Sequence, residues 1–458
     1  MKYILESYIE PVGYEGLPCA YYDRKRNRTV FLDKERFFLL LQCDGTDEID
    51  REDLSEVQKA FLDSMIESGI VREAKDGEER KVFREYRTFP TRYRETAPWS
   101  VTGGCNYRCK HCFMSASDFT FGHISTEKCL EICRQLGECG IRSVFITGGE
   151  PLIREDLLQI IDGLLENGVR PTGILTNGGL VTETFLDELI RRDVRPGFQF
   201  SYDGVGWHDW LRGVDGAEEK LLQAFTMLRA RGLRFSCAMM LHRHNVHTIR
   251  ETVLKVAEYG GESLKVNVAS PDGEWKKQTE NALTVEEGYQ AYLDYLPQYI
   301  EDGMPISITL DGAFSNDGRD GAYSIFDKGE NGFYESACVC RTMRRSVYIS
   351  PTGDVYPCQT MIDTENQVFQ NLFDTPLSDI LLASYYNTFA TCSVREFSEH
   401  NNKCANCEYF MRCRGGCRAK GYTQNRSDYY HEDENACLYF RNGWAEKFRP
   451  YIEKINHN

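Results

Sequence analysis

The sequence predicts an α/β protein: a partial barrel of six strand–helix units, preceded by an α+β domain and followed by a cysteine-rich domain. Three observations support this prediction. Short apolar runs alternate with amphipathic stretches over residues 96–310, as in a parallel sheet with crossover helices. Residues 1–80 combine strand-like and helical patterns, and nine of the 18 cysteines follow residue 337. We place a linker at residues 81–95 and the third domain at residues 311–458.

Each barrel unit is expected to contribute one strand and one helix. The strands are expected at Trp99–Thr102, Ser143–Thr147, Gly173–Leu175, Phe198–Ser201, Phe235–Leu241 and Leu264–Val268. The helices are expected near 126–139, 154–167, 182–192, 216–231, 246–259 and 284–301. Thr126 and Thr284 are predicted N-caps, because a hydroxyl accepts a hydrogen bond from a free amide at a helix start. In α/β barrels the chemistry lies at the carboxyl ends of the strands.

The N-terminal unit has the element order of a winged-helix domain. Strand-like runs at 3–9, 17–22 and 29–32 precede helical segments that include 55–68, and a short strand at 70–71 ends the unit. It contains no cysteine cluster and no catalytic constellation, so it is better suited to binding than to chemistry. A module for DNA binding or dimerisation is the alternative. Pro90 and the repeated Arg and Glu around it mark the linker.

The composition is typical of an ordinary enzyme of several domains. The 458 residues suggest about three domains, and a hydrophobic fraction of 41% is enough for buried cores. The formal charge of −16 disfavours nucleic acid as a partner, because phosphate binding needs a basic surface. The N-terminus lacks a basic segment followed by an apolar one, and no apolar run approaches ~18 residues. We therefore expect a cytoplasmic protein with reduced thiols and no membrane partner.

Three cysteines early in the barrel have the spacing of iron–sulfur ligands. Cys105, Cys109 and Cys112 follow the pattern C-x3-C-x2-C, so one short loop offers three thiolates. A [4Fe–4S] cluster normally takes four Cys ligands, so one iron would stay open to a ligand that is not protein. Two alternatives fit less well. Structural zinc needs four ligands, and the next cysteine, Cys129, lies in a helical pattern. Disulfides belong to oxidising compartments.

This loop resembles the cysteine motif of the radical S-adenosylmethionine (SAM) enzymes, although His111 stands where that family has an aromatic residue. The resemblance extends over the barrel stretch. It implies that the open iron binds SAM, and that the reduced cluster cleaves SAM to a 5′-deoxyadenosyl radical. Motifs after later strands imply further SAM-binding residues, namely Gly148, Gly149, Glu150, Asn177, Ser201 and Arg212. Taken alone, a Gly-Gly pair after a strand is a common turn.

A second cysteine array follows the barrel and is similar to the seven-cysteine SPASM pattern, which holds two auxiliary [4Fe–4S] clusters in that family. By resemblance, one cluster would bind Cys404, Cys407, Cys413 and Cys437. The other would bind Cys340, Cys358 and Cys417, with Cys338 as a fourth ligand or with one iron open for the substrate. A pair of zinc knuckles is the alternative, since the spacing over 404–417 also suits zinc. The implied cofactors are SAM and three [4Fe–4S] clusters.

The N-terminal unit resembles the RiPP recognition element, a winged-helix-like domain in which a leader peptide adds a strand to an exposed sheet edge. Together the resemblances imply a radical SAM maturase that installs crosslinks in a ribosomally synthesised precursor peptide, with a Cys thioether as the expected bond. The implied partners are the precursor peptide, whose leader binds residues 1–80, and a reducing electron donor such as flavodoxin or ferredoxin.

Other activities remain open in the sequence. A carbon–carbon crosslink between side chains is the nearest alternative. An anaerobic sulfatase maturase, which forms formylglycine, shares the barrel and both auxiliary clusters. That branch lacks a recognition domain and has Asp after the cysteine equivalent to Cys358, whereas this chain has Gln359. A zinc-bearing DNA-binding regulator would not explain the first cysteine motif. Asp311, Asp317 and Asp320 are candidates for a general base.

Overall fold

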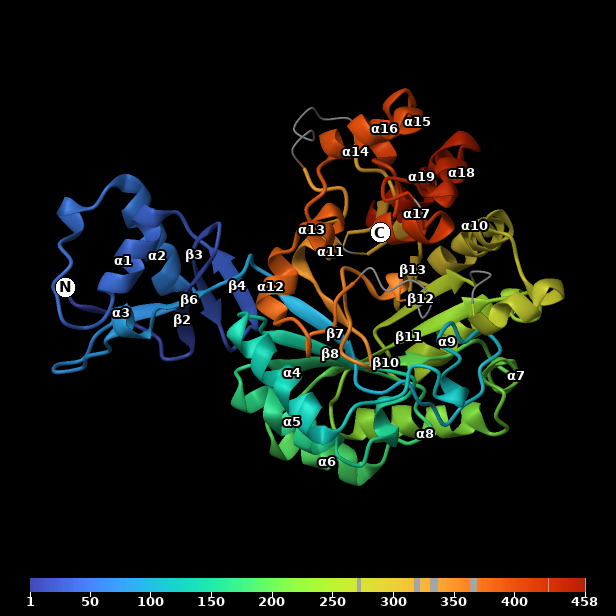
Figure 1. The fold of residues 1–458 in the computed structure, drawn as a ribbon, viewed down its shortest axis with the longest axis horizontal. Coiled ribbons are helices and arrows are strands. Elements are labelled where there is room, and N and C mark those ends of the chain that lie inside the picture. Colours follow the sequence, from blue (N-terminus) through green and yellow to red (C-terminus); the bar gives the residue numbers. More distant parts are fainter. Residues whose placement is uncertain (270–272, 317–321, 330–336, 363–368, 427, 458) are drawn as a thin grey trace.

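The computed structural model describes residues 1–269, 273–316, 322–329, 337–362, 369–426 and 428–457. Figure 1 shows an N-terminal domain on the left, the barrel at the lower right and the cysteine-rich domain above the barrel. Among the residues described, no helix is both long enough and apolar enough to cross a membrane.

The barrel is built on one sheet of order β15-β14-β13-β12-β11-β10-β9-β8-β7-β16-β17. Its parallel centre consists of β7 (Thr96–Ser100), β8 (Ser143–Thr147), β9 (Arg170–Thr176), β10 (Gly197–Ser201), β11 (Phe235–Leu241), β12 (Ser263–Val268) and β13 (Ser307–Leu310). The six predicted strands are confirmed, and β13 is a seventh parallel strand that was not predicted. Because neighbouring strands are parallel, the loops that follow them lie on one edge of the sheet.

Helices between the strands cover the outer face of this sheet (Figure 1). They are α4 (Thr126–Glu138), α5 (Leu157–Glu166), α6 (Glu183–Arg191), α7 (His208–Arg212), α8 (Ala217–Ala230), α9 (Ile249–Glu258) and α10 (Val285–Glu301). The predicted N-cap at Thr284 is confirmed, since its hydroxyl accepts from the Glu287 amide at 3.1 Å. The predicted N-cap at Thr126 is wrong. Ser125 caps α4, and the Thr126 hydroxyl donates to Asp156 at 2.5 Å instead.

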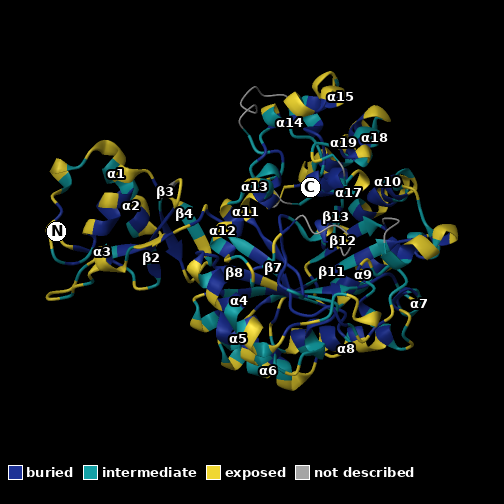
Figure 2. Ribbon diagram, in the orientation of Figure 1, coloured by how far each residue is buried: buried dark blue, intermediate teal, exposed yellow. Residues whose placement is uncertain are grey.

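An apolar core fills the space between the sheet and its helices, seen as dark blue ribbon in Figure 2. Alternate residues of β11 are buried, as the two-residue period of a strand requires. Phe225 stacks on Phe235 at 4.4 Å, and Phe200 meets Phe225 edge-on at 5.2 Å. Burying one such side chain stabilises the fold by about 1.5–3 kcal/mol. The core therefore holds the strand ends, and the loops that follow them, in fixed positions.

The N-terminal domain contains a four-stranded sheet of order β4-β3-β2-β6 and a two-stranded sheet of β1 and β5. The strands are β1 (Tyr3–Leu5), β2 (Ile9–Tyr14), β3 (Leu17–Asp23), β4 (Arg28–Phe31), β5 (Val71–Glu73) and β6 (Arg87–Phe89). The helices are α1 (Lys34–Gln42), α2 (Glu56–Glu67) and α3 (Val82–Glu85). β6 lies in the segment expected to be a linker, and it pairs in parallel with β2. β4 forms one edge of the larger sheet.

The cysteine-rich domain is attached to both edges of the barrel sheet. β14 (Phe314–Ser315) and β15 (Ser324–Ile325) extend one edge, and the hairpin of β16 (Tyr348–Ile349) and β17 (Val355–Tyr356) extends the other beside β7. Its helices are α11 (Arg341–Arg345), α12 (Leu377–Leu382), α13 (Ser384–Ala390), α14 (Val394–His400), α15 (Asn402–Ala405), α16 (Phe410–Cys413), α17 (Arg418–Gln424), α18 (Glu434–Arg441) and α19 (Trp444–His457). α19 returns to pack against α10 and β15.

Candidate active site and cysteine groups

The three cysteines of the first motif lie in the loop that follows β7, and each thiol accepts an N–H hydrogen bond from a different residue. The pairs are Tyr107 N to Cys105 Sγ at 3.4 Å, Arg212 Nη1 to Cys109 Sγ at 3.6 Å and Ala116 N to Cys112 Sγ at 3.3 Å. Such donors stabilise negative charge on sulfur. Hydrogen bonds to the ligand sulfurs are also one of the factors that set the potential of an iron–sulfur cluster.

Two glycines let the loop after β8 lie directly against the cysteine loop. The Gly149 amide donates to Thr102 O at 2.8 Å, and the Glu150 amide donates to Gly104 O at 2.8 Å. A Cβ atom on Gly149 would lie 2.2 Å from Gly104 O, and one on Gly148 would lie 2.6 Å from Thr102 O. A side chain at either position would push the two loops apart, so the close backbone approach requires glycine.

Glu150 is a fully buried carboxyl group that titrates near neutral pH. Its carboxylate accepts hydrogen bonds from Asn177 N at 2.7 Å, Thr176 Oγ1 at 2.8 Å and Leu152 N at 3.1 Å. Burial raises the pKa of Glu150 to about 7, although these hydrogen bonds oppose the rise. Asn177 also donates through Nδ2 to Asn106 at 2.8 Å and to Cys105 Sγ at 3.7 Å. Asn177 therefore joins Glu150 to the cysteine loop.

Asp203 fixes the guanidinium of Arg212 beside the cysteine loop. Arg212 Nε donates to Asp203 Oδ2 at 2.6 Å, and both side chains are buried. The amide of Met240, on β11, donates to Asp203 Oδ1 at 3.0 Å and orients the carboxylate. Burial raises the pKa of Asp203, but Arg212 and His208 outweigh it, and the pKa is well below its usual value. The buried pair is therefore ionised and holds Arg212 in one position.

His111, between the second and third motif cysteines, is neutral in this site. Burial and the nearby Arg212 lower the pKa of His111 to about 3. Within the described parts of the chain, its Nδ1 atom has no hydrogen-bond partner. His242, whose ring lies 4.9 Å from the Trp210 ring, also has a pKa lowered by burial, to about 4. Neither imidazole carries charge at neutral pH.

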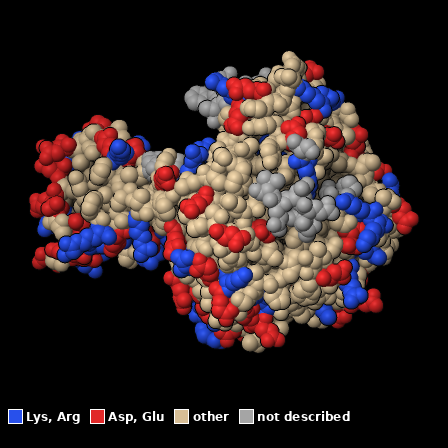
Figure 3. All heavy atoms as spheres, in the orientation of Figure 1, with Lys and Arg blue, Asp and Glu red and all other residues tan. Residues whose placement is uncertain are grey.

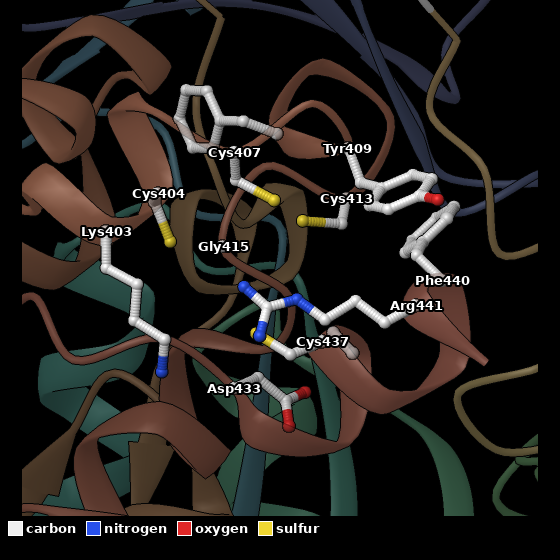
Figure 4. A pocket seen from close by; sticks show the side chains of 12 residues that line it. Lys403, Cys404, Cys407, Tyr409, Cys413, Gly415, Asp433, Cys437, Phe440 and Arg441 are labelled. Atoms are coloured by element: carbon white, nitrogen blue, oxygen red, sulfur yellow. The ribbon is translucent and has the colours of Figure 1, made fainter.

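Four cysteines of the C-terminal array line one pocket, and Figure 4 shows their sulfur atoms directed toward the same space. The cysteines are Cys404 on α15, Cys407 in the following loop, Cys413 on α16 and Cys437 on α18. Lys403 and Arg441 line the same pocket. Burial raises the pKa of Cys437, and these two cations oppose the rise. The pocket thus combines four thiols with two cations, which favour the thiolate form of Cys437.

A second group consists of Cys340, Cys358 and Cys417, which pack against one apolar cluster that includes Met343 and Tyr356. Burial raises the pKa values of Cys358 and Cys417. Cys340 adds to the rise at Cys358, and Cys358 adds to the rise at Cys417, so the three thiols lie close enough to repel as thiolates. Cys358 is therefore near both ends of the predicted set, Cys340 and Cys417.

Cys338 and Arg418 border this second group. The Cys338 thiol donates to Ala390 O at 3.4 Å and to Cys340 O at 3.5 Å, so backbone carbonyls engage it. Arg418 is fully buried, and its guanidinium lies 4.7 Å from the Phe397 ring. Burial lowers the pKa of Arg418, and nearby cysteines oppose the fall. The cysteines that interact with this buried cation are Cys340 and Cys417 of the second group and Cys392 outside it.

The donor chemistry of these groups fits iron–sulfur clusters. Thiolates are the ligands that such clusters take from protein, and each group offers three or four. In the described residues, no group of three or more His, Cys, Asp or Glu is close enough together to hold a single metal ion. A [4Fe–4S] cluster places its ligands on separate irons and so needs a wider spacing than one ion does. The clearest case is the pocket lined by Cys404, Cys407, Cys413 and Cys437, whose four sulfur atoms are directed toward one space.

The structure brings most of the predicted SAM-site residues to one edge of the sheet. Hydrogen bonds join Glu150 and Asn177 to the first cysteine loop, and Arg212 contacts it from α7. Ser201 ends β10 at the same edge and is half-buried, but it makes no hydrogen bond to the other predicted residues. Sequence reasoning gave no firm role to Asp203, which is two residues beyond Ser201. The buried pair with Arg212 could be found only from the fold.

The general-base candidates have different outcomes. Asp311 is held between two lysines, Lys420 at 3.1 Å and Lys265 at 3.4 Å. Burial raises the pKa of Asp311, but the lysines outweigh it and lower the pKa to about 2. An Asp with this pKa is a weak base at neutral pH. Asp317 and Asp320 lie outside the described residues.

Comparison with known families agrees with this geometry. Residues 99–256 match the Radical SAM superfamily, and residues 338–408 match SPASM, an iron-sulfur cluster-binding domain. The chain is therefore a radical SAM enzyme that carries a SPASM domain. These two domains imply SAM and iron–sulfur clusters as its cofactors.

Three known proteins show how this chain is related to others. It is 27% identical to an AdoMet-dependent heme synthase of Oleidesulfovibrio alaskensis, over 74% of this chain and 86% of the relative. It is 23% identical to the antilisterial bacteriocin subtilosin biosynthesis protein AlbA of Bacillus subtilis, over 76% of this chain and 72% of the relative. The crystal structure of Streptococcus suis SuiB bound to precursor peptide SuiA is similar with a TM-score of 0.64 at 16% identity. That likeness covers 95% of this chain and 99% of SuiB, and it shows a shared fold.

Proposed function

We propose that this enzyme crosslinks the side chains of a ribosomally synthesised precursor peptide, and that the bond formed is a Cys thioether. One observation carries the proposal. An open cavity of 2250 Å³ is lined both by Thr29 and Phe31 of β4 and by Cys340 and Cys417 of the SPASM domain. A peptide held on the N-terminal domain can therefore reach the auxiliary cysteines along one continuous surface. A relative named for subtilosin biosynthesis and the precursor complex of SuiB support a peptide substrate.

The free edge of β4 is the proposed binding site of the leader peptide. Leu32 N donates to Cys19 O at 2.9 Å, and Val30 pairs with Tyr21. Since antiparallel hydrogen bonds alternate along a strand, the amides of Thr29 and Phe31 point away from β3. These amides can pair with an added strand, the usual mode of leader binding in recognition elements of this type.

Three [4Fe–4S] clusters are proposed, one at each cysteine group. When bound, SAM and the reduced cluster of the first motif supply a 5′-deoxyadenosyl radical. Glu150 is proposed to bind the SAM amino group as a carboxylate, and Arg212 to stabilise the charge on Cys109. Asn177, Ser201 and the paired glycines complete the site. These roles are the ones that the resemblance to radical SAM enzymes implies, and the common place of the residues at the carboxyl edge of the sheet supports them.

Thioether formation balances with the cofactors named. The C–H bond of the peptide breaks and its hydrogen leaves in 5′-deoxyadenosine, while the thiol proton passes to solvent. One C–S bond forms, and one electron leaves the peptide for an auxiliary cluster. The electron that starts the reaction comes from a reduced donor such as flavodoxin or ferredoxin. In the second cysteine group Cys358 interacts with both Cys340 and Cys417, and backbone carbonyls engage the Cys338 thiol, which supports an open ligand position for a substrate sulfur.

Two other reactions are weaker candidates. Heme synthesis, named for several relatives, corresponds to matches that cover 74% of this chain, whereas the likeness to SuiB covers 95% of it. Formylglycine formation is disfavoured because Gln359, which cannot act as a carboxylate base, follows Cys358. A carbon–carbon crosslink uses the same radical and the same domains, and only the product distinguishes it from a thioether.

The test uses the reconstituted enzyme under anaerobic conditions with dithionite, SAM and, in turn, each small Cys-containing peptide that the flanking genes encode. The expected product has lost two hydrogen atoms for each crosslink, and its sulfur resists alkylation. The same loss with free thiols would assign a carbon–carbon crosslink. An unchanged peptide, despite release of 5′-deoxyadenosine, would contradict peptide crosslinking.

The contribution of β4 is tested with two variants of one residue. Thr29→Pro removes an outward amide while leaving the bonds of β4 to β3 intact, and Thr29→Val keeps that amide. We expect leader affinity to fall about tenfold or more in Thr29→Pro, as loss of a main-chain pairing site implies, and to stay near wild type in Thr29→Val. Equal leader affinity of the two variants would exclude β4 as the leader site.

A further inference from the structure

Six arginines line the cavity between the N-terminal domain and the SPASM domain. We call five of them the cationic rim: Arg92, Arg94, Arg341, Arg344 and Arg345. The sixth is Arg414, and the carboxylates of Asp311, Asp327, Asp433 and Glu434 line other parts of the same cavity. On the face shown in Figure 3, both basic and acidic side chains lie where the N-terminal domain meets the rest of the molecule. The concentration of arginines in the rim stands out in a chain whose formal net charge is −16.

Protein carboxylates neutralise little of this charge. Glu95 forms an ion pair with Arg345. For the other four arginines of the rim, the residues that the structure describes include no ion-pair partner. Arg92, Arg341 and Arg344 are exposed, so water solvates them when the cavity is empty. The rim is therefore available to an anionic ligand.

Arg94 is the most informative member of the rim. Its side chain is 2% exposed, and Nη1 donates to Tyr93 O at 3.0 Å. Nε and Nη2 are buried and have no hydrogen-bond partner in the described part of the protein. A buried guanidinium with two free donors is costly unless an acceptor binds it. These two nitrogens have almost no accessible surface and the guanidinium lies 5.8 Å from the Tyr386 ring, so Arg94 adds positive charge to the cavity wall. The exposed Arg92, Arg341 and Arg344 are the members that a ligand can contact directly.

The rim lies between the two parts of the proposed peptide path. At one end, Thr29 and Phe31 line the same cavity, and Phe31 is 38% exposed. At the other end, Arg94 and Arg344 are close enough to Cys338 to lower the pKa of its thiol, against the larger rise from burial. A chain that runs from β4 to the auxiliary cysteines therefore passes the rim.

We propose that the cationic rim binds Asp and Glu side chains in the segment of the precursor peptide that connects its leader strand to the residues that are modified. This proposal rests on the proposed function and adds the chemistry of the recognised segment. A free sheet edge beside the rim favours a polypeptide over other polyanions, because only a polypeptide can pair with β4.

The test measures fluorescence anisotropy with the reconstituted holoenzyme and two synthetic labelled peptides. Both peptides begin with a strand-forming segment of Thr and Val. In the segment that follows, Gly alternates with Glu in one peptide and with Gln in the other. We expect the Glu peptide to bind at least about tenfold more tightly, as charge-assisted hydrogen bonds predict. High salt should reduce this preference, because screening weakens exposed charge pairs.

The double variant Arg92→Gln/Arg344→Gln should lose most of the preference for Glu. Arg234→Gln is the matched control, since this arginine is 75% exposed and lies outside the cavity lining. Iron content and the thermal midpoint show whether each variant is folded. Equal affinities for the two peptides in the wild type, or an undiminished preference in the double variant, would overturn the proposal. Tighter binding of an oligonucleotide of equal charge would also overturn it, in favour of a nucleic-acid ligand.

The two proposals fail in different ways. If the Glu preference and its loss in the double variant are observed, but no peptide is ever modified, the cationic rim stands and the proposed reaction is wrong. If the precursor peptide is crosslinked without any Glu preference, the reaction stands and the role of the rim is wrong.

Discussion

Arg212 donates one hydrogen bond to Cys109 Sγ at 3.6 Å and another to Asp203 at 2.6 Å. The guanidinium therefore connects a cysteine of the first motif to Asp203, which lies in the loop that follows β10. Burial raises the pKa of Cys109, and Arg212 opposes the rise. The charged form of the thiol depends on a cation that is itself fixed by a buried carboxylate.

Removing this cation should weaken the first cysteine site. We expect Arg212→Gln to lower iron retention at that site or the rate of 5′-deoxyadenosine formation about 10–100-fold, the usual effect of losing a residue that orients a metal ligand. Arg212→Lys should recover part of the loss, because it keeps the charge but not the fork of donors. Iron analysis and product quantification measure both effects. Equal behaviour of the Gln and Lys variants would show that charge is not the important property.

Gly149→Ala should separate the first two barrel loops. Its Cβ would lie 2.2 Å from Gly104 O, so backbone must move, at a cost of about 1–3 kcal/mol. The matched control is Gly197→Ala on β10, where the nearest atom is 3.9 Å away. We expect a lower thermal midpoint and less iron in the first variant only. Similar losses in both would mean that the close approach of the loops is unimportant.

SAM affinity should rise with pH through the titration of Glu150. With a pKa of about 7, the carboxyl is about one-tenth ionised at pH 6 and about nine-tenths ionised at pH 8. Only the ionised form attracts the SAM amino group, so affinity relative to Glu150→Gln should increase about tenfold over this range. Equilibrium dialysis at several pH values measures the ratio. A ratio independent of pH would remove Glu150 from the SAM site.

Cys413→Ala should remove one cluster and leave the others. Four cysteines line the pocket in Figure 4. Without Cys413, a cluster in this pocket would have only three of its four Cys ligands. Iron should fall from about twelve to about eight atoms per chain, as expected for three [4Fe–4S] clusters. Cys139→Ala, a change at a buried cysteine outside the groups, is the control. Retention of full iron in Cys413→Ala would contradict the assignment of this pocket.

The sequence predicts the barrel and the cysteine groups well because their signals are local. Apolar periodicity locates the strands, and the spacing of Cys105, Cys109 and Cys112 can be recognised without knowledge of the fold. The N-cap of α4 was missed by one residue, since Ser125 and Thr126 both carry hydroxyls and only the contact of Thr126 with Asp156 distinguishes them. Such a choice depends on a residue thirty positions away.

Long-range relationships could not be predicted from the chain alone. β6 lies among charged residues whose pattern is typical of a linker, and its pairing with β2 joins positions that are far apart in the sequence. The role of Asp203 depends on Arg212 and on an amide of β11. The cavity that connects β4 to Cys340 arises from the packing of three domains, and no local pattern encodes it.

The most direct test of the central claim follows hydrogen from the peptide to the cofactor. The reconstituted enzyme is incubated anaerobically with dithionite, unlabelled SAM and a uniformly deuterated precursor peptide, and the 5′-deoxyadenosine is analysed by mass spectrometry. Radical modification of the peptide predicts 5′-deoxyadenosine that contains deuterium, in step with crosslinked peptide. Unlabelled 5′-deoxyadenosine beside an intact peptide would show that the precursor is not the substrate of this enzyme.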